Sequence, residues 1–229
     1  MLWKRILPDG WWPRVVSGTA FPTVAGALAM NIHGKNNFRM GTIGEHVVEF
    51  TALLPTGAEV TCSPKLNADL FYSMISGLGM LGIFTAITMQ MKKIESGLLE
   101  VHAWPVHELH EHLSFIQEKA PDFDYTVGWM DTMNGGKGLG RGQIHAANYL
   151  HGTEDPHPRE TMKLENQVLP PRIFGLFPKS ILYVFMKPFA NNLGWRAVNI
   201  AKYAASLRTH TFRQPHAAFH FLLDYVPNW

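Results

Sequence analysis

The spacing of hydrophobic residues predicts a β-hairpin and a further strand in the first hundred residues. Apolar and polar positions alternate on both sides of a Pro-Thr-Gly turn in residues 47–63 (VVEFTALLPTGAEVTCS), and Gly57 suits the positive φ that such a turn needs. Residues 83–94 (IFTAITMQMKKI) alternate again and are rich in β-branched side chains. We therefore expect three strands, two of which form a hairpin.

Two other segments have the spacing of amphipathic helices. Residues 67–76 begin with Asn67, a residue that often caps a helix. The apolar face of this helix is expected to contain Leu70, Phe71 and Met74. Residues 104–124 (WPVHELHEHLSFIQEKAPDFD) predict a second helix. Its core-facing residues are expected at i, i+4 and i+7, namely Leu109, Leu113 and Ile116.

The second half of the chain has the pattern of an antiparallel sheet with helices on one side. Residues 126–133 (TVGWMDTM) and 141–150 (RGQIHAANYL) predict two strands joined by a glycine-rich connection. The composition changes near residues 94–97, just before the second helix. We therefore expect an α+β fold, with one domain in residues 1–95 and a second in residues 96–229.

Composition excludes several classes of protein. Of the 229 residues, 17% are charged and the formal net charge is only +2, which is unlike a nucleic-acid-binding arm or a disordered tail. The single cysteine, Cys62, excludes an internal disulfide framework and a metal site built from cysteines. The first residues, MLWKRILPDGWWPRVVSG, carry charges and prolines where a secretory signal needs an apolar core. A cytoplasmic protein that binds no nucleic acid is expected.

Residues 173–195 (IFGLFPKSILYVFMKPFANNLGW) are the most hydrophobic stretch of the second half. Pro178, Lys179, Lys187 and Pro188 interrupt it, so its longest uncharged run is too short for a membrane span of about 20 residues. Aromatic side chains mixed with lysines suit contact with a membrane surface, although buried helices beside a cavity have the same composition. Peripheral membrane association through this segment is therefore one of two interpretations.

A G-x-G-x-x-G motif occurs at Gly77, Gly79 and Gly82. A dinucleotide-binding fingerprint needs a strand before the glycines and a helix after them, because the pyrophosphate binds at the N-terminus of that helix. Here the predicted helix precedes the glycines and the predicted strand follows them. We interpret the motif as a tight helix-to-strand turn whose glycines permit close packing. The functional alternative is that Gly82 and Ile83 bring the main chain close to a bound ring.

Two further motifs resemble ligand sites without matching them. The stretch HELHEH places His110 three residues after His107 rather than four, and no third ligand is evident, so we expect a solvated helix face and no metal. The stretch GGKGLGRG lacks the G-K-[ST] ending of a phosphate loop. It predicts a flexible connection, with contact between Arg141 and a substrate phosphate as the alternative.

The stretch TVAGALAMNIHGKN, residues 23–36, is different in character. Its small side chains leave the main chain accessible, so that a flat cofactor with polar edges can lie against it. Gly34 would allow a turn that directs both His33 and Lys35 toward the cavity above this surface. The alternative is a tightly packed helix followed by a surface turn.

These residues resemble a known family. The stretch SGTAFPTVAGALAMNIHGKNN, the following GTIGEHV, the LLPTG hairpin and NADLFYSMISGLGMLGIFTAITMQMKK are similar to the second half of the FAD-binding, PCMH-type domain of vanillyl-alcohol-oxidase-type flavoproteins. Within them, the resemblance is to the decaprenylphosphoryl-ribose oxidase group. It continues more weakly through DYTVGWMDTMNGGKGLGRGQI and FHFLLDYVPNW. It implies an FAD domain followed by part of a substrate domain built on an antiparallel sheet.

The resemblance also implies roles for individual residues. His33 and Lys35 would lie over the reactive face of the flavin as catalytic residues, and Lys35, Trp129 and His220 would bind substrate. The residues implied to line FAD are Gly18, Thr19, Thr23, Val24, Ala25, Gly26, Ala29, Met30, Asn31, Ile32, His33 and Ile83.

The implied chemistry is oxidation of a secondary alcohol by hydride transfer to flavin N5 while a base takes the hydroxyl proton. The C–H must approach N5 to about 3–3.5 Å, so positioning by the protein matters most. The implied substrate is a small or lipid-linked, sugar-like molecule. Lys35 would hold an anionic phosphate, and His33 would orient the hydroxyl or the ring.

The chain departs from the family pattern in several places. Ala25 stands where relatives often carry a second glycine. The N-terminal phosphate-binding loop of the family has no counterpart, and the chain stops inside the substrate domain. We therefore expect a fragment that lacks N- and C-terminal parts of the same fold and is inactive alone, because half an FAD lobe leaves sheet edges unpaired.

Alternatives to this interpretation remain. One is a sugar-lactone or alditol oxidase, or a sterol-reductase-like flavoenzyme of the same superfamily. Another is a truncated, non-catalytic protein that binds a membrane or a partner through residues 173–195.

Overall fold

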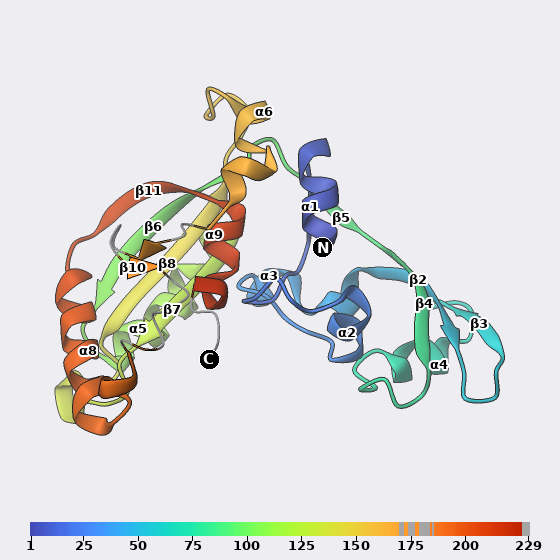
Figure 1. Cartoon of the computed structure of the whole chain (residues 1–229), viewed down its shortest axis with the longest axis horizontal. Helices are drawn as coiled ribbons and strands as arrows, with labels where there is room; N and C mark the ends of the chain where they lie inside the picture. Colours follow the sequence, from blue (N-terminus) through green and yellow to red (C-terminus); the bar gives the residue numbers. More distant parts are fainter. Residues whose placement is uncertain (170–171, 174–176, 179–183, 185, 226–229) are drawn as a thin grey trace.

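The structure, a computed structural model, describes residues 1–169, 172–173, 177–178, 184 and 186–225. The two larger antiparallel sheets, each accompanied by helices, lie at opposite ends of the molecule (Figure 1). The mixed α+β class expected from the sequence is confirmed. We call the part from α1 to β5 the N-terminal lobe and the part from β6 onward the C-terminal lobe. The division into two domains at residues 95 and 96 stays a prediction.

The N-terminal lobe is built on a three-stranded sheet of order β3-β2-β4 and a small two-stranded sheet, β1-β5. Its elements are α1 (Leu2–Ile6), η1 (Leu7–Asp9), β1 (Trp11–Pro13), α2 (Val24–Ala29), α3 (Asn37–Met40), η2 (Ile43–His46), β2 (Val47–Leu53), β3 (Glu59–Cys62), α4 (Ala68–Met74), β4 (Ile83–Met89) and β5 (Met91–Lys93).

The C-terminal lobe is built on a four-stranded sheet of order β11-β6-β8-β7. Its described elements are β6 (Leu98–Val106), α5 (Leu109–Glu118), η3 (Ala120–Asp122), β7 (Tyr125–Met130), η4 (Gly136–Gly138), β8 (Gly142–Tyr149), α6 (Pro158–Thr161), η5 (Leu164–Gln167), β9 (Arg172–Ile173), β10 (Phe177–Pro178), η7 (Lys187–Phe189), α8 (Asn192–Ala205), β11 (His210–Pro215), α9 (His216–His220) and η8 (Leu222–Tyr225).

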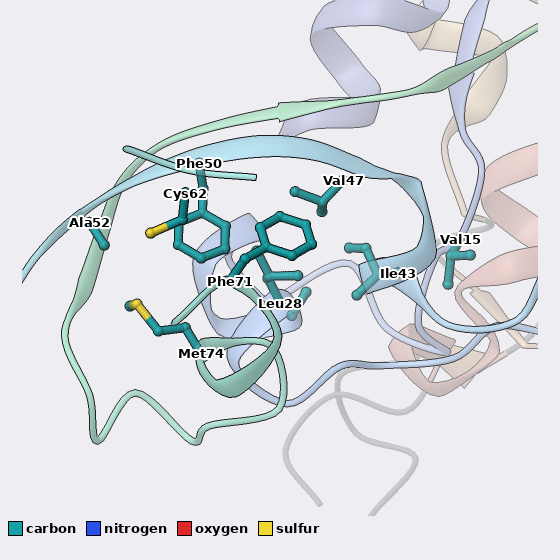
Figure 2. Close-up of a cluster of buried hydrophobic side chains, with 10 residues drawn as sticks. Val15, Leu28, Ile43, Val47, Phe50, Ala52, Cys62, Phe71 and Met74 are labelled. Atoms are coloured by element: carbon teal, nitrogen blue, oxygen red, sulfur yellow. The ribbon is translucent and has the colours of Figure 1, made fainter. Parts of the chain in front are cut away.

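The predicted hairpin is confirmed. Strands β2 and β3 pair antiparallel, and Gly57 in the turn has a φ of 82°. On the inner face, Phe50 of β2 stacks on Phe71 of α4, with the ring centroids 5.3 Å apart (Figure 2). Both rings are almost completely buried, and together with the neighbouring side chains of α2 they form the core of this lobe.

The predicted helix at residues 67–76 is confirmed as α4, with Phe71 and Met74 buried. The role expected for Asn67 was wrong, because its side chain does not cap the helix. Asn67 adopts the left-handed conformation, with a φ of 51°, and its amide Nδ2 donates a hydrogen bond to the carbonyl of Thr61, 2.8 Å away. The tight link between β3 and α4 turns this side chain back toward β3.

The predicted order of helix, glycines and strand around residues 77–82 is also confirmed. Helix α4 ends before the glycines, and β4 begins directly after Gly82. A Cβ atom on Gly82 would lie 2.7 Å from the carbonyl oxygen of Leu53, so the glycine permits close packing of β4 against the end of β2. This is the arrangement of a packing turn.

The strand predicted at residues 83–94 is confirmed, with one interruption. The strand leaves the three-stranded sheet at Gln90, whose N–H donates to the carbonyl of His46, 2.8 Å away. The residues that follow form β5 and pair antiparallel with β1, where Trp11 lies opposite Lys93. This second pairing ties the N-terminal segment to the strand that leads into the C-terminal lobe.

The helix predicted over residues 104–124 is confirmed only within α5, because residues 104–106 belong to strand β6, and the face expected to be buried was also wrong. Leu109, Leu113 and Ile116 are 38–51% exposed, and the buried residues are His112 and Phe115. His112 lies over glycines of β7 and β8, whose missing side chains leave room for the imidazole ring. The sheet, rather than the helix alone, determines which face is buried.

Strands β7 and β8 confirm the two strands predicted in the second half. The expectation of helices on one side of the sheet was wrong. Phe115 of α5 packs against Ile144 and Ala146, whereas Phe219 of α9 packs against the face that contains Tyr125 and its neighbours. Successive strand residues point to opposite faces, so α5 and α9 cover the two sides of one sheet.

A shared apolar cluster joins the two lobes. Trp3, Leu7 and Trp12 of the N-terminal segment pack with Ala217 and Phe221 of the C-terminal lobe. The first and last described segments therefore lie against one another (Figure 1).

None of the helices in the described part of the chain combines the length and the apolar character that a membrane span requires. The membrane contact predicted for residues 173–195 falls partly outside the described residues and stays a prediction.

Candidate cofactor site

A turn of residues 17–20 is held in place from the far end of the chain. The hydroxyl of Thr19 donates to Oδ1 of Asp224, 2.5 Å away, and the N–H of Ala20 donates to Oδ2 of the same carboxylate, 3.1 Å away. The N–H of Leu223 donates to the carbonyl of Gly18 at 3.2 Å. The turn therefore has a fixed shape that depends on both lobes.

Helix α2 follows this turn directly. Thr23 caps it, because its hydroxyl oxygen accepts a hydrogen bond from the N–H of Gly26, 3.0 Å away. Among the described residues, a Cβ atom added to Gly26 would contact only that Thr23 oxygen within 4 Å. The main chain at Gly26 is therefore otherwise uncovered, as the small side chains of this stretch predict.

The turn and the start of α2 border a cavity of about 360 Å³ at the junction of the two lobes. The wall is largely apolar, with the side chains of Ser17, Thr19 and Thr23 as polar groups. Its other lining residues are Met1, Leu2, Trp3, Pro13, Val15, Val16, Ala20, Phe21, Pro22, Val24, Ala27, Ile32, Ile43, Met89 and Phe221. Such a surface fits a flat, mostly apolar group with polar edges.

Comparison with known families identifies this part of the chain. Residues 2–63 match the FAD binding domain family. The matched segment contains residues 17–23, α2 and the His33-Gly34-Lys35 stretch, which are among the residues from which the resemblance was drawn. That resemblance is confirmed, and FAD is the cofactor that the match supports.

Similar proteins include oxidases and dehydrogenases. Decaprenylphosphoryl-beta-D-ribose oxidase from Mycolicibacterium smegmatis is 31% identical over 145 residues, which cover 62% of this chain and 32% of that protein. A putative D-arabinono-1,4-lactone oxidase from Neurospora crassa is 35% identical over 68 residues, covering 30% of this chain and 12% of that protein. Cytokinin dehydrogenase 4 from Arabidopsis thaliana is 41% identical over 63 residues, covering 28% and 12%. These matches span about a third of the relatives' length or less.

The predicted FAD residues fall into three groups around α2. Thr19, Thr23, Val24 and Ile32 line the cavity, and Gly18 belongs to the turn beside it. Ala25 borders a neighbouring hollow of about 320 Å³, between α2 and β4.

The other predicted FAD residues lie farther along the same lobe. Met30 is 60% exposed, and the carbonyl of Ala29 accepts a hydrogen bond from the N–H of Leu78. Asn31 has a positive φ of 45°, and its side-chain oxygen accepts from the N–H of Gly44, 2.9 Å away. Ile83, at the start of β4, is 66% exposed.

The predicted catalytic residues His33 and Lys35 have different surroundings. His33 is exposed and forms a backbone bridge with Thr42. Lys35 turns inward, and its Nζ donates to the carbonyl of His220, 2.5 Å away. Neither side chain lines the 360 Å³ cavity. The two side chains were expected to face one hollow together, and in the described part of the chain they do not.

Lys35 is electrostatically unusual. Burial lowers the pKa of its ammonium group from 10.5 to about 8. The ring of Phe219 lies 5.8 Å from Nζ and the carbonyl of His220 is its hydrogen-bond partner, so little compensates for lost hydration. An ammonium group in this position favours an anionic group if one comes within reach.

The predicted substrate residues Trp129 and His220 lie toward the same side of the C-terminal sheet. His220 is fully buried, with its ring 4.5 Å from that of Tyr125 on β7. Trp129 is four residues farther along β7 and so points to the same face as Tyr125. The Nζ of Lys202 on α8 lies 4.2 Å from the centroid of the Trp129 ring. The structure thus associates His220 with Lys35, and Trp129 with a different lysine.

The residues of the other two motifs, HELHEH and GGKGLGRG, contact other side chains of the C-terminal lobe. In HELHEH, the Nδ1 of His107 is hydrogen-bonded to the hydroxyl of Tyr203, while burial lowers the pKa of His112. No group of three or more His, Cys, Asp or Glu side chains in the described part of the chain is arranged to hold a metal ion. Arg141 donates from Nε to the buried carboxylate of Asp131, 3.1 Å away.

Sequence reasoning missed Asp224, the residue that fixes the Thr19 turn. It lies 205 positions from its partner, so no local spacing connects them. Its only signal is an acidic residue inside the apolar run FHFLLDYV, where a carboxylate needs a polar partner.

Proposed function

We propose that the protein containing this chain is an FAD-dependent oxidoreductase that oxidises a secondary alcohol of a sugar-like substrate. The proposal is supported by the match of residues 2–63 to the FAD binding domain family and by relatives named as oxidases and dehydrogenases. The relative named decaprenylphosphoryl-beta-D-ribose oxidase supports a lipid-phosphate-linked sugar.

The observation that carries the proposal is the cavity beside α2. Most of its wall comes from the family-matched residues 2–63, the wall is mostly apolar, and helix α2 borders it through Val24 and Ala27. When bound, the flavin of FAD supplies the acceptor for the hydride that leaves the carbinol carbon. The hydroxyl proton passes to a base, and the alcohol becomes a ketone.

The chain's own residues would bind and orient. Thr19 and Thr23 offer hydroxyl groups at the cavity wall, and Asp224 holds the turn that presents Thr19. Lys35 would attract an anionic part of the substrate once a ligand competes for its ammonium group with the His220 carbonyl. His33 would orient the hydroxyl or the ring from the exposed end of the same stretch, and Trp129 would form an apolar wall for the sugar.

The test uses the longer protein that contains this chain together with its genomic flanks. A purified protein with an absorption band near about 450 nm that bleaches with substrate supports the proposal. A correctly folded longer protein that neither copurifies with flavin nor binds added FAD would rule it out. We expect residues 1–229 alone to bind flavin poorly.

A matched pair of variants tests the turn. In the longer protein, Asp224→Ala should weaken FAD binding at least about tenfold, because the Thr19 hydroxyl and the Ala20 N–H lose a charged acceptor. Asp122→Ala, at an exposed carboxylate, is the control and should bind FAD like the unaltered protein. Equal affinities of the two folded variants would contradict a role for the turn in holding the cofactor.

A lactone is the alternative substrate, since two relatives are named as D-arabinono-1,4-lactone oxidases or putative ones. Flavin reduction measured with a phosphorylated sugar and with an aldonolactone distinguishes the two. Faster reduction by the aldonolactone would favour this alternative.

A further inference from the structure

A second, smaller hollow of about 120 Å³ lies between the lobes, away from the cavity beside α2. Its N-terminal wall comes from the residue after β1, from α3 with its N-cap and from β5, and its C-terminal wall from the residue before β7 and the last residue of β8. The lining residues are Arg14, Asn36, Arg39, Met40, Lys92, Asp124 and Tyr149. Three cationic side chains therefore surround one carboxylate.

The single carboxylate is already engaged. Oδ1 of Asp124 lies 3.4 Å from Nη1 of Arg39, and Oδ2 accepts a hydrogen bond from the N–H of Tyr149, 3.1 Å away. Among the described residues, neither Arg14 nor Lys92 belongs to an ion pair. The hollow thus keeps an excess of positive charge after its internal pairing is complete.

Arg14 and Lys92 line the hollow together with Tyr149. The Nζ of Lys92 lies 5.1 Å from the centroid of the Tyr149 ring. Burial raises the pKa of Tyr149, and the positive charge of Arg14, which lines the same hollow, acts in the opposite direction. The Nε of Arg14 is buried and has no hydrogen-bond partner in the described part of the chain. A buried guanidinium N–H without an acceptor is costly unless a ligand satisfies it.

Asn36 contributes a hydrogen-bond acceptor to the residues that line the hollow. Its Nδ2 donates to the carbonyl of Arg14, 2.7 Å away, which fixes the orientation of the amide. Its Oδ1 is buried and has no partner among the described residues. Asn36 lines the hollow, so we infer that a protonated anion bound there is the partner of this acceptor.

We propose that this hollow binds phosphate, either as the free ion or as the terminal group of a phosphate ester. Phosphate near neutral pH carries both negative charge and a P–OH group. Its oxygens can accept from Arg14 and Lys92 while its hydroxyl donates to Oδ1 of Asn36. Sulfate has a similar size and shape but no proton to donate, so the site discriminates against it.

Because the walls come from both lobes, the bound anion stabilises their contact. Arg39 already spans the lobes, with Nη1 donating to the carbonyl of Phe123 at 3.1 Å. The site does not depend on the proposed oxidoreductase function, since phosphate binding is measured without flavin. Failure to bind FAD and failure to bind phosphate are therefore separate results.

The experiment measures thermal unfolding and isothermal titration of the chain with inorganic phosphate and with sulfate at matched ionic strength. Phosphate should raise the unfolding temperature and bind at least about tenfold more tightly than sulfate, since a ligand that binds only the folded state stabilises it. Ribose 5-phosphate is titrated in parallel. Tighter binding of this ester than of the free ion identifies a phosphate ester as the occupant, and equal or weaker binding identifies the free ion.

Three variants complete the design. Arg14→Gln should weaken phosphate binding at least about tenfold, and Lys92→Gln, at an exposed position, several-fold without affecting folding. Lys65→Gln removes an equally exposed cation away from the hollow and should leave the affinity unchanged. The proposal is overturned if folded wild-type protein shows no phosphate binding, if sulfate binds as tightly, or if Lys92→Gln behaves like Lys65→Gln.

Discussion

Replacing Lys35 by methionine should change the pH dependence of stability in a defined direction. The ammonium group is buried at the lobe junction, and its pKa falls from 10.5 to about 8 on folding. A pKa difference of one corresponds to about 1.4 kcal/mol, so this depression corresponds to about 3 kcal/mol of destabilisation at neutral pH. Methionine has a similar length and no charge, so it removes that cost.

The sign follows from proton binding. Between about pH 8 and pH 10.5 the unfolded chain keeps the Lys35 proton while the folded chain releases it, so the folded state gains stability as pH rises. Below about pH 8 both states are protonated and the full cost remains. The Lys35→Met variant lacks this titration, although it also leaves the His220 carbonyl without its partner, a loss of about 1–3 kcal/mol at every pH.

Urea unfolding of both proteins at about pH 7 and about pH 10 measures the effect. The free energy of unfolding of the unaltered protein, relative to Lys35→Met, should rise by most of the 3 kcal/mol estimated above between these two pH values. Lys65→Met, at an exposed lysine, is the control and should show a constant difference. A difference for Lys35→Met that does not vary with pH would show that the ammonium group is not desolvated and would refute the reasoning.

In each lobe, one buried and one exposed position are compared to test the packing. Phe71→Ala should lower the free energy of unfolding by about 3–5 kcal/mol, because the ring is 2% exposed and stacks on Phe50, whereas Tyr72→Ala, at a side chain 63% exposed, should cost less than about 1 kcal/mol. Gly142→Ala should destabilise by at least about 2 kcal/mol, since its methyl group would overlap a main-chain carbonyl of β7, while Gly135→Ala meets nothing within 4 Å and should stay within about 0.5 kcal/mol. Urea unfolding of the four variants checks both comparisons, and equal costs within either pair would contradict the packing described here.

Local elements were predictable because their causes are local. The hairpin at residues 47–63 depends on alternation within each strand and on a glycine turn, and both lie within seventeen residues of sequence. The order of α4, glycines and β4 was predictable for the same reason, and it was sufficient to exclude a dinucleotide fingerprint. The small side chains of residues 23–30 predicted an accessible main chain, and space is open beside Gly26, but Ala27 and Leu28 of the same helix are buried in the core, as in the alternative of a tightly packed helix.

The face of α5 that is buried was determined by the sheet and not by the sequence of the helix. The leucines at i and i+4 made one face apolar, yet His112 is the residue that the sheet covers, because glycines of β7 and β8 leave space beneath it. A helix can turn either face inward, and its partner surface selects one. That surface is formed by residues that are distant in sequence.

The sequence by itself predicted the β2-β3 hairpin, α4, β4, β7 and β8, because hydrophobic spacing and turn residues act over a few residues, but it did not predict β6 or β11. The cofactor segment within residues 17–36 was indicated by small side chains at residues 25–29 and, for the rest, by the resemblance to a family. Only the tertiary structure decided that Asp224 holds the turn at Thr19 and that Lys35 donates to the His220 carbonyl while His33 is exposed. Hydrogen bonds and desolvation act between groups that folding brings within a few ångströms, and no short-range pattern records which distant groups will meet.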